Sequence, residues 1–203
     1  MKAFDALSAD QLRAKPGPSI VGRQIVVLEE TTSTNNSVLE RSSPSTPEGL
    51  VVFAERQTAG RGQRNTFWES ATGKGLWFSI LLRPKIKIGD SPRLAEWAAR
   101  TVAETISKEL ALPASVKLPN DVIVAGKKIA GVLVEMRAQP NAPHIAIVGI
   151  GVNVNHQPKD FSEELRPRAI SLAMALERDI DRRRLAVALL RNLDRTYADT
   201  VGR

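Results

Sequence analysis

The order of the predicted helices and strands constrains the fold of this chain more than any other feature of its sequence. One long amphipathic helix is predicted over residues 91–110, where Pro92 falls in the first turn and apolar residues recur at helical spacing. Segments of β character surround it, at 24–30, 50–56, 76–83, 122–125, 129–136 and 145–155. Successive strands with few helices predict a mixed sheet with helices on one face, an α/β fold of the α+β kind.

Shorter elements complete the predicted fold. Residues 125–126 should form a tight turn that pairs the strands on either side of it as a hairpin. Residues 1–20 should form a short helix followed by an extended segment around Pro16 and Pro18. Another short helix should begin at a polar cap within 34–36, a third should begin within 171–176, and Asp181 should cap a last helix.

Composition excludes several kinds of chemistry. The 203 residues include no cysteine, which rules out disulfides, iron–sulfur clusters and cysteine nucleophiles. The two histidines, His144 and His156, do not supply the partners that a zinc site needs. No apolar run approaches the roughly 20 residues that cross a bilayer, and no signal-peptide core is found. We therefore expect a cytoplasmic protein with no membrane partner.

The formal net charge of +7 favours an anionic partner. Basic residues are scattered except at 56–64 and 182–184, and aromatic residues do not alternate with them as stacking platforms would. Small anions are thus favoured over nucleic acid, although an RNA-binding domain stays open as an alternative.

Two polar segments could contact such a ligand. Residues 32–35, Thr-Ser-Thr-Asn, follow the first strand and serve either as a helix cap or as a compact set of donors and acceptors. In residues 57–64, Gly60 and Gly62 flank Arg61, so backbone N–H groups and a guanidinium can converge on an anion. A solvated basic loop is the alternative. Trp68, just beyond, either covers a base or plugs the core.

A third segment, residues 117–121, reads Lys-Leu-Pro-Asn-Asp and makes a good turn. Lys128 begins the strand beyond it, where a lysine is held rigidly enough to neutralise charge during a reaction. Asp121 is the carboxylate placed to receive Mg²⁺ or an incoming amine. Strict alternation would put Lys128, Ala130 and Val132 on one face, and Ile129, Gly131 and Leu133 on the other.

The fourth segment is Gly-Ile-Gly-Val-Asn at 149–153. Alternation places both glycines and Asn153 on one face, with apolar residues on the other. Glycine inside a strand marks close approach by a ligand or by another backbone, so either a binding site or helix packing explains it.

Taken in order, these segments resemble the catalytic domain of biotin–protein ligases. The matches to that family are Ser33-Thr34-Asn35, Gln57 with Gly60-Arg61-Gly62, residues 117–121, Lys128, Gly131, Glu135 and 149–153. They cover roughly residues 25 to 195 and are specific as a set. The resemblance implies a sheet flanked by helices, related to class II aminoacyl-tRNA synthetases, over residues 21–203 after an N-terminal segment, 1–20.

The resemblance also implies an ATP-dependent biotin–[acetyl-CoA-carboxylase] ligase. Biotin and MgATP would give biotinyl-5′-AMP, from which a lysine of a carboxylase's biotin carrier domain would take the biotin. By that pattern, the catalytic candidates are Lys128, Arg61 and Asp121, and Asp121 is also the candidate for Mg²⁺. Biotin would contact Ser33, Thr34, Asn35, Gln57, Gly60, Arg61, Gly62, Lys128 and Gly131. The nucleotide would contact Arg61, Gln63, Arg64, Trp68, Lys117, Asn120 and Asn153.

The sequence departs from the family pattern in two places and suggests limits on its partners. Gln63 stands where a second arginine is usual, which predicts a less firmly held adenylate unless Arg64 replaces it, and Leu118 replaces a tryptophan. We find neither a helix-turn-helix segment nor the small C-terminal β domain of the family, so no DNA partner is expected, and a homodimer is an option. The alternatives are a lipoate or octanoate ligase or transferase, or a non-catalytic binder of biotin, nucleotide or RNA.

Overall fold

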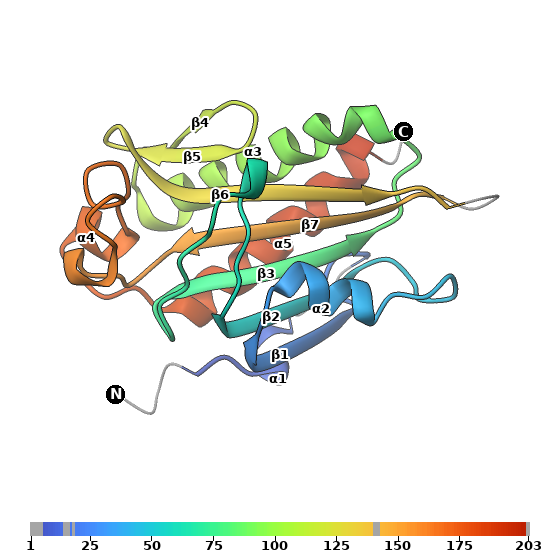
Figure 1. The fold of residues 1–203 in the computed structure, drawn as a ribbon, viewed down its shortest axis with the longest axis horizontal. Coiled ribbons are helices and arrows are strands. Elements are labelled where there is room, and N and C mark those ends of the chain that lie inside the picture. The colour runs from blue at the N-terminus through green and yellow to red at the C-terminus, as the bar shows by residue number, and fades with distance from the viewer. Residues whose placement is uncertain (1–5, 14–16, 18, 140–142, 202–203) are drawn as a thin grey trace.

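A seven-stranded mixed sheet forms the centre of the computed structural model, which describes residues 6–13, 17, 19–139 and 143–201. The strands are β1 (Gln24–Thr31), β2 (Leu50–Gln57), β3 (Gly75–Leu82), β4 (Ser115–Lys117), β5 (Asp121–Val124), β6 (Lys127–Arg137) and β7 (Ile145–Asn153). Their order across the sheet is β1-β2-β3-β7-β6-β5-β4 (Figure 1). β1 and β2 are parallel, and the other neighbouring pairs are antiparallel. The predicted mixed sheet is confirmed.

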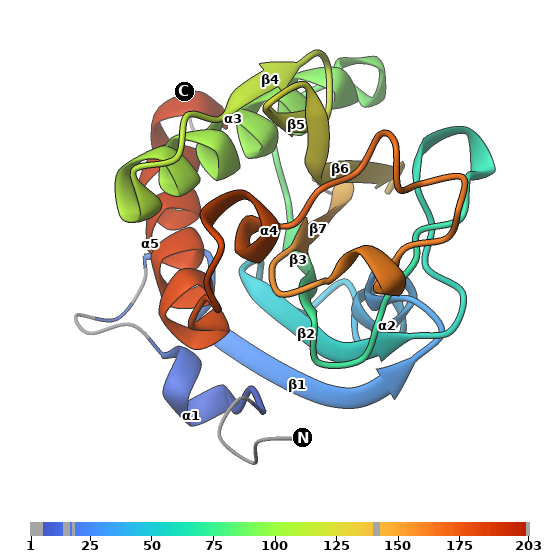
Figure 2. The ribbon, with the colours of Figure 1, turned by 90° about the vertical axis from the view of Figure 1, so that its left-hand side faces the viewer.

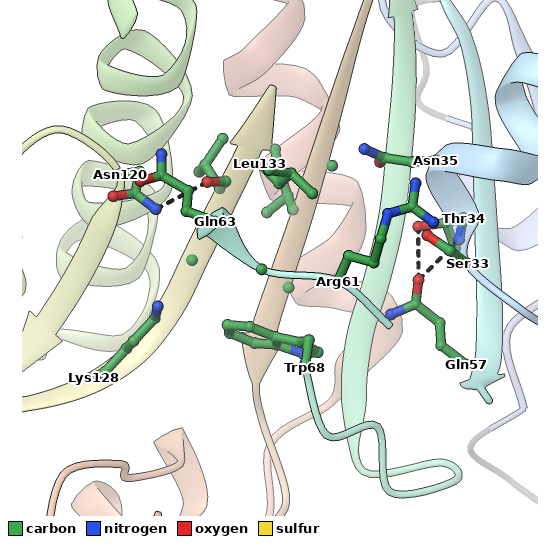
Figure 3. Close-up of a pocket in the computed structure, with 16 residues that line it drawn as sticks. Ser33, Thr34, Asn35, Gln57, Arg61, Gln63, Trp68, Asn120, Lys128 and Leu133 are labelled. Carbon is green, nitrogen blue, oxygen red and sulfur yellow. Dashed lines mark hydrogen bonds between the residues drawn. The ribbon is translucent and has the colours of Figure 1, made fainter. Parts of the chain in front are cut away.

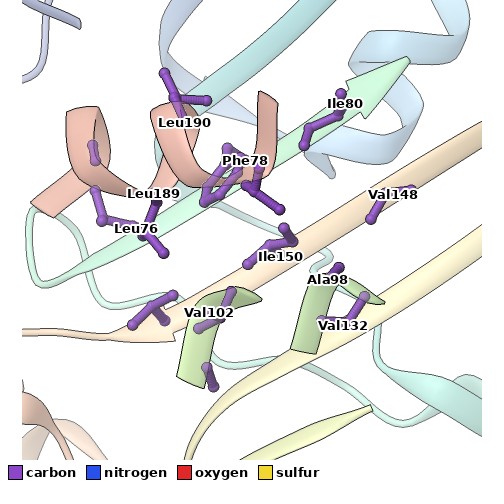
Figure 4. Packing of buried hydrophobic residues seen from close by; sticks show 14 of the residues in the cluster. Leu76, Phe78, Ile80, Ala98, Val102, Val132, Val148, Ile150, Leu189 and Leu190 are labelled. Atoms are coloured by element: carbon purple, nitrogen blue, oxygen red, sulfur yellow. The ribbon is translucent and has the colours of Figure 1, made fainter. Parts of the chain in front are cut away.

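Two long helices, α3 (Ser91–Leu110) and α5 (Arg182–Val201), pack together on one face of the sheet (Figure 2). The apolar stripe predicted for α3 is buried there, with Val102 fully enclosed. Phe78 of β3 lies in the same layer (Figure 4). Its ring stacks on that of Phe53, with the ring centroids 4.7 Å apart. Each large apolar side chain buried in this way contributes about 1.5–3 kcal/mol, so this layer is the main source of stability.

A third helix, α2 (Thr34–Glu40), covers the opposite face, and the expectation that helices lie on one face only is wrong. Val38 of α2 packs in a second cluster with Leu81 and Ile147. The sequence carries a signal of this arrangement, because residues 50–54 form a continuous apolar run rather than an alternating one. Such a run is typical of a strand that is buried on both faces.

The N-terminal segment packs onto the same core. The predicted short helix is α1 (Ala9–Leu12), whose last residue is fully buried. The Asp194 carboxylate of α5 accepts hydrogen bonds from the backbone N–H groups of residues 19–21 at 2.7–2.8 Å. The extended stretch predicted around Pro16 and Pro18 lies outside the described residues.

The predicted caps and the tight turn are largely confirmed. Ser171 Oγ accepts the N–H of Met174 at the start of α4 (Leu172–Leu176), and Asp181 accepts two N–H groups at the start of α5. Gly126 lies in the turn between β5 and β6 with a φ of 75°, a value that suits glycine. Short 3₁₀ turns occur at Gln63–Asn65, Ile88–Asp90 and Pro158–Asp160. Within the described part of the chain, no helix is long and apolar enough to span a membrane.

Candidate active site

The candidate site is a pocket on the face of the sheet that carries α2, beside the loop that follows β2 (Figure 3). It holds about 430 Å³ of space, part of it open to solvent. Its lining consists of Ser33, Thr34, Asn35, Gln57, Arg61, Gly62, Gln63, Trp68, Asn120, Lys128, Gly131, Val132, Leu133, Gly149, Ile150 and Gly151. Polar residues from four separate sequence segments therefore meet in one cavity.

Three glycines form the floor of the pocket. Gly131 of β6 is directly opposite Gly151 of β7, and Gly149 precedes Gly151 on the same face. A Cβ atom added at Gly151 would lie 2.6 Å from the Trp68 ring, and one at Gly149 would lie 2.3 Å from Asn35 Oδ1. The predicted glycine face is confirmed, and it admits two of the protein's own side chains against the sheet.

The first turn of α2 forms the buried polar end of the pocket. Ser33 is the N-cap residue, and the side chain of Gln57 performs the capping: its Oε1 accepts the Thr34 N–H at 2.8 Å and the Thr34 hydroxyl at 3.1 Å. The expectation that a residue within 34–36 caps this helix is therefore wrong. Gln57 caps it from β2 because the strand end lies next to the helix start, a long-range contact that local sequence does not reveal.

Asn35 begins a chain of polar contacts that leads to a cation. Its Nδ2 donates to Glu135 Oε2 at 2.6 Å, and the same carboxylate pairs with Arg61 at 3.1 Å. Arg61 also donates to Asn36 Oδ1 at 2.9 Å. The guanidinium is thus held in place by a carboxylate from β6 and an amide from α2.

Ser79 of β3 is a contributor to this site that analysis of the residues did not single out. Its hydroxyl is fully buried, 2.7 Å from Thr34 Oγ1 and 2.6 Å from Asn35 Oδ1. The available signal is a hydroxyl within the otherwise apolar strand segment 76–82. Buried polar groups need hydrogen-bonding partners, so such a residue indicates polar neighbours across the sheet face.

Lys128 and Asp121 form an ion pair at the other end of the pocket, with Nζ 2.6 Å from Oδ1. Lys128 Nζ also lies 5.2 Å from the centroid of the Trp68 ring, within the range of a cation–π contact. The two candidate catalytic residues on these neighbouring strands therefore contact each other directly, a pairing that the sequence did not predict. Both side chains are about one-third exposed, which leaves them accessible to a ligand.

The predicted alternation along β6 is wrong at its start. The register with β5 shifts between Val122 and Ile123, which pair with Ala130 and Lys128 and so leave Ile129 as an extra residue. This β-bulge turns Lys128 to the pocket face shared with Gly131, whereas Ile129, Ala130 and Val132 are buried in the core. A bulge adds one residue to a strand without changing its composition, so alternation alone cannot locate it.

The loop after β2 folds back on itself through backbone hydrogen bonds, which does not fit the alternative of a merely solvated basic loop. The Trp68 N–H donates to the Gly60 carbonyl at 2.9 Å, and the Gly62 N–H donates to the Thr66 carbonyl at 2.7 Å. A Cβ at Gly60 would lie 2.6 Å from the Trp68 carbonyl oxygen. These contacts fold the loop back on itself and place Trp68 over the glycine floor.

The other predicted residues are not all in the pocket. Asn120 lines it and donates to the Val132 carbonyl at 3.1 Å. Lys117 and Arg64 are exposed outside the lining. Gly60 is buried behind the lining residues, and Asn153 donates its amide to the Ile170 carbonyl at 3.2 Å.

The acidic groups that the structure describes do not form a cage for a resident metal ion. Among the residues that the structure describes, no cluster of three or more His, Asp or Glu side chains is suitably arranged. Asp121 is the acidic residue next to the pocket's lysine, and it already pairs with that lysine. Mg²⁺ commonly binds through substrate phosphates and one or two carboxylates, so Asp121 fits an ion that arrives with its substrate.

The fold and the pocket together define an α/β domain whose cavity suits a small molecule with a hydrogen-bonding end and an anionic end. Buried hydroxyl and amide groups gather at α2, and Arg61 and Lys128 supply positive charge toward the opening. Each cation lies beside a carboxylate that orients it.

Comparison with known proteins identifies the family. The sequence profile of the biotin/lipoate A/B protein ligase family matches residues 27–153, and the chain belongs to that family. It is 36% identical over 193 residues to the bifunctional ligase/repressor BirA of Bacillus subtilis, covering 95% of this chain and 59% of that protein. It is also 36% identical over 181 residues to the biotin–[acetyl-CoA-carboxylase] ligase of Mycobacterium tuberculosis, covering 85% of this chain and 63% of that protein.

The structural comparison agrees. The biotin protein ligase of Aquifex aeolicus in complex with biotin and ATP superimposes with a TM-score of 0.75 and 31% identity, over 88% of this chain and 73% of that one. The chain spans about three-fifths of the length of the two curated relatives described above. The predicted family and fold class are confirmed.

Proposed function

We propose that this chain carries the ligase domain of an ATP-dependent, AMP-forming biotin–[acetyl-CoA-carboxylase] ligase. The domain would span residues 21–203 and 1–20 would be an N-terminal segment, of which described residues such as Leu12 and Ile20 pack against the domain. One observation carries the proposal: a buried hydrogen-bonding end and two oriented cations share one pocket, in a fold that matches a ligase solved with biotin and ATP. The ligand that suits such a pocket has a polar ring at one end and a carboxylate at the other.

The polar end would hold the ureido ring of biotin. The residues that we assign to biotin are Ser33, Thr34, Asn35, Gln57, Gly60, Arg61, Gly62, Lys128 and Gly131. A ureido group has one carbonyl acceptor and two N–H donors, so it needs both kinds of partner in a small volume. Hydroxyl groups supply both, and the amides of Asn35 and Gln57 are already held by Glu135 and by the backbone and hydroxyl of Thr34. Gly60, whose Cβ would meet the Trp68 carbonyl, would act through the shape of the loop.

The cationic end would promote adenylate formation. A carboxylate oxygen of biotin attacks the α-phosphorus of MgATP, a P–O bond forms, and pyrophosphate leaves with the electron pair of the broken P–O bond. Both reactants are negatively charged, so cations must offset their repulsion and the charge of the transition state. Arg61 and Lys128 would supply these cations. Their ion pairs with Glu135 and Asp121 hold both side chains before the substrates bind, which lowers the cost of ordering them.

The nucleotide would lie against the loop side of the pocket. Arg61, Gln63, Trp68 and Asn120 line the cavity there, and the indole ring offers a flat surface for adenine. Arg64 and Lys117 are exposed, so they would reach the phosphates only by turning inward. Asn153 is assigned to the nucleotide from the resemblance alone, because its amide is bonded to the Ile170 carbonyl.

The second step would transfer biotin to a protein. A lysine amine of a biotin carrier domain, from acetyl-CoA carboxylase or a related carboxylase, attacks the acyl carbon of the mixed anhydride, and AMP leaves. The attacking amine must lose a proton during this step. Asp121 is the acidic residue beside Lys128 and is the proposed group to receive the amine.

A lipoate or octanoate ligase of the same family is the other candidate. A dithiolane ring or an alkyl chain has no ureido group, and it would place an apolar surface against Ser33, a buried polar residue that lines this end of the pocket. Burying polar groups without partners is costly, so the pocket favours biotin. Calorimetry with biotin and with lipoate separates the two, and tighter binding of lipoate would reverse the assignment.

The direct test is to incubate the chain with biotin, MgATP and a biotin carrier domain, and then to measure the intact mass of the carrier by mass spectrometry. We expect a mass increase equal to one biotin, accompanied by release of pyrophosphate. Omission of the carrier separates the half-reactions, because pyrophosphate release alone reports adenylate formation. Absence of both products, in a folded chain that does not bind biotin, would overturn the proposal.

A further inference from the structure

Ser79 lies at the point where the sheet meets the polar end of the pocket. It is in the middle of β3, it is fully buried, and its sequence neighbours from 76 to 82 are all apolar. Packing does not require a hydroxyl here, because an alanine would fill nearly the same space. The hydroxyl instead points at two side chains of α2, Thr34 and Asn35.

A count of protons gives this hydroxyl a specific role. The Thr34 hydroxyl donates to Gln57 Oε1, so its one proton is already used. The Ser79 oxygen lies 2.7 Å from Thr34 Oγ1 and 2.6 Å from Asn35 Oδ1. Among the contacts that the structure describes between these three side chains, the Ser79 hydroxyl therefore carries the only proton still available. The two acceptors share that single proton, so Ser79 donates to one of them at a time.

The orientation of the Asn35 amide suits Glu135 on one side and Ser79 on the other. With Oδ1 toward Ser79, Nδ2 points to Glu135 and donates at 2.6 Å. Rotating the amide by half a turn would place Oδ1 against the Glu135 carboxylate, two acceptors without a proton between them. The same carboxylate pairs with Arg61, so the orientation of Asn35 affects the cation that faces the ligand.

We propose that Ser79 is a positioning residue for the biotin end of the pocket: through Thr34 and Asn35 it fixes the pattern of donors and acceptors that selects a ureido ring. The proposal rests on the proposed function for the identity of the ligand. Ser79 does not line the pocket itself, so it acts only through these two neighbours. Its loss should weaken biotin binding more than it slows the reaction of bound biotin.

The experiment compares Ser79→Ala with a matched control, Ser37→Ala. Ser37 is also a buried serine whose hydroxyl contacts a threonine, Thr31 Oγ1 at 2.7 Å, but it lies outside the pocket lining. Loss of a buried hydrogen bond changes an equilibrium by roughly ten- to a hundredfold. We expect Ser79→Ala to raise the Kd for biotin about tenfold or more while kcat at saturating biotin changes less than about threefold. Ser37→Ala should leave both values near those of the parent chain.

A double-mutant cycle tests whether Ser79 acts through Asn35. In an Asn35→Ala background, adding Ser79→Ala should raise the biotin Kd by much less than it does alone. The proposal would be overturned if the two substitutions raised the biotin Kd by independent factors that multiply in the double variant. It would also be overturned if the parent and Ser79→Ala bound biotin with equal affinity. If Ser79→Ala does not fold, Ser79→Cys keeps the side-chain shape with a weaker donor and should still weaken biotin binding.

A ligand-free measurement separates this inference from the proposed function. NMR can follow the exchange of the Asn35 side-chain amide protons with solvent. Their exchange rate should increase in Ser79→Ala and should not change in Ser37→Ala. Unchanged exchange in Ser79→Ala would overturn the positioning role even if the chain proves to be a biotin ligase. Failure of the parent chain to bind biotin would instead overturn the proposed function, and with it the claim that a ureido ring is selected.

Discussion

Gly131 and Gly151 lie directly opposite each other on β6 and β7, and the indole ring of Trp68 rests on the surface that they leave bare. A methyl group at Gly151 would come within 2.6 Å of that ring. We therefore expect Gly151→Ala to displace Trp68 and to weaken biotin and ATP binding at least tenfold, because the ring forms one wall of the pocket.

Gly89→Ala is the matched control for this substitution. A Cβ at Gly89 meets no atom within 4 Å, so ligand affinity should not change. Calorimetry with each ligand, alongside the intrinsic fluorescence of the tryptophans, measures the effect. Parent-like affinity in a folded Gly151→Ala variant would show that the indole can leave the glycine surface without consequence.

Lys128 should be required for adenylate formation. Removing its charge in Lys128→Ala leaves Asp121 without its partner and takes one of two cations from the α-phosphate, so we expect pyrophosphate release to fall roughly a hundredfold or more. Lys127→Ala is the control, since that lysine precedes Lys128 but does not line the pocket. Near-normal release by folded Lys128→Ala would count against any catalytic role for this lysine.

Most of the fold could be predicted because each element carries a local signal. The long apolar stripe of α3 and the alternation in β7 both report which face is buried, and both predictions hold. The bulge at Ile129 gave no such signal, since a bulge changes the pairing between two strands rather than the composition of either. The position of α2 on the opposite face was missed although the doubly buried strand at 50–54 indicates it.

The sequence indicated many of the residues that line the pocket, but it did not indicate their contacts. Motif resemblance singled out Arg61, Lys128 and Asn35, which do meet in one pocket. Their partners are distant in sequence: Asn35 bonds to Glu135, a hundred residues away. Ser79 could not be predicted as part of the site, because a single serine within an apolar strand is common and the sequence does not show that it contacts Asn35.

Gln63 should make the adenylate easier to lose. It lines the pocket at a register where the family usually has arginine, and a neutral amide cannot form the charge-assisted bonds of a guanidinium. We expect Gln63→Arg to slow release of biotinyl-5′-AMP about tenfold, since such bonds contribute roughly 1.5–3 kcal/mol. The assay follows radiolabelled adenylate leaving the protein in the absence of carrier. Equal release rates would dismiss the idea, and faster release in Arg64→Ala would show that Arg64 already supplies the missing charge.

His156 should make the folded state sensitive to acid. Its ring is buried between Trp77 and Phe161. Burial, the largest of several influences, lowers the pKa of His156 from 6.5 to about 4. In the unfolded chain the imidazole takes up a proton near pH 6.5, whereas in the folded chain it stays neutral down to about pH 4. The unfolded state therefore binds more protons across that window, and stability falls as the pH is lowered through it. The resulting loss in the free energy of unfolding is about 3 kcal/mol at pH 4.

Urea unfolding at pH 7.5 and 4.5 measures this loss of stability. His156→Phe should remove most of the loss, whereas His144→Phe, at a partly exposed position, should not. An equal pH dependence in parent and His156→Phe would assign the acid sensitivity to other groups.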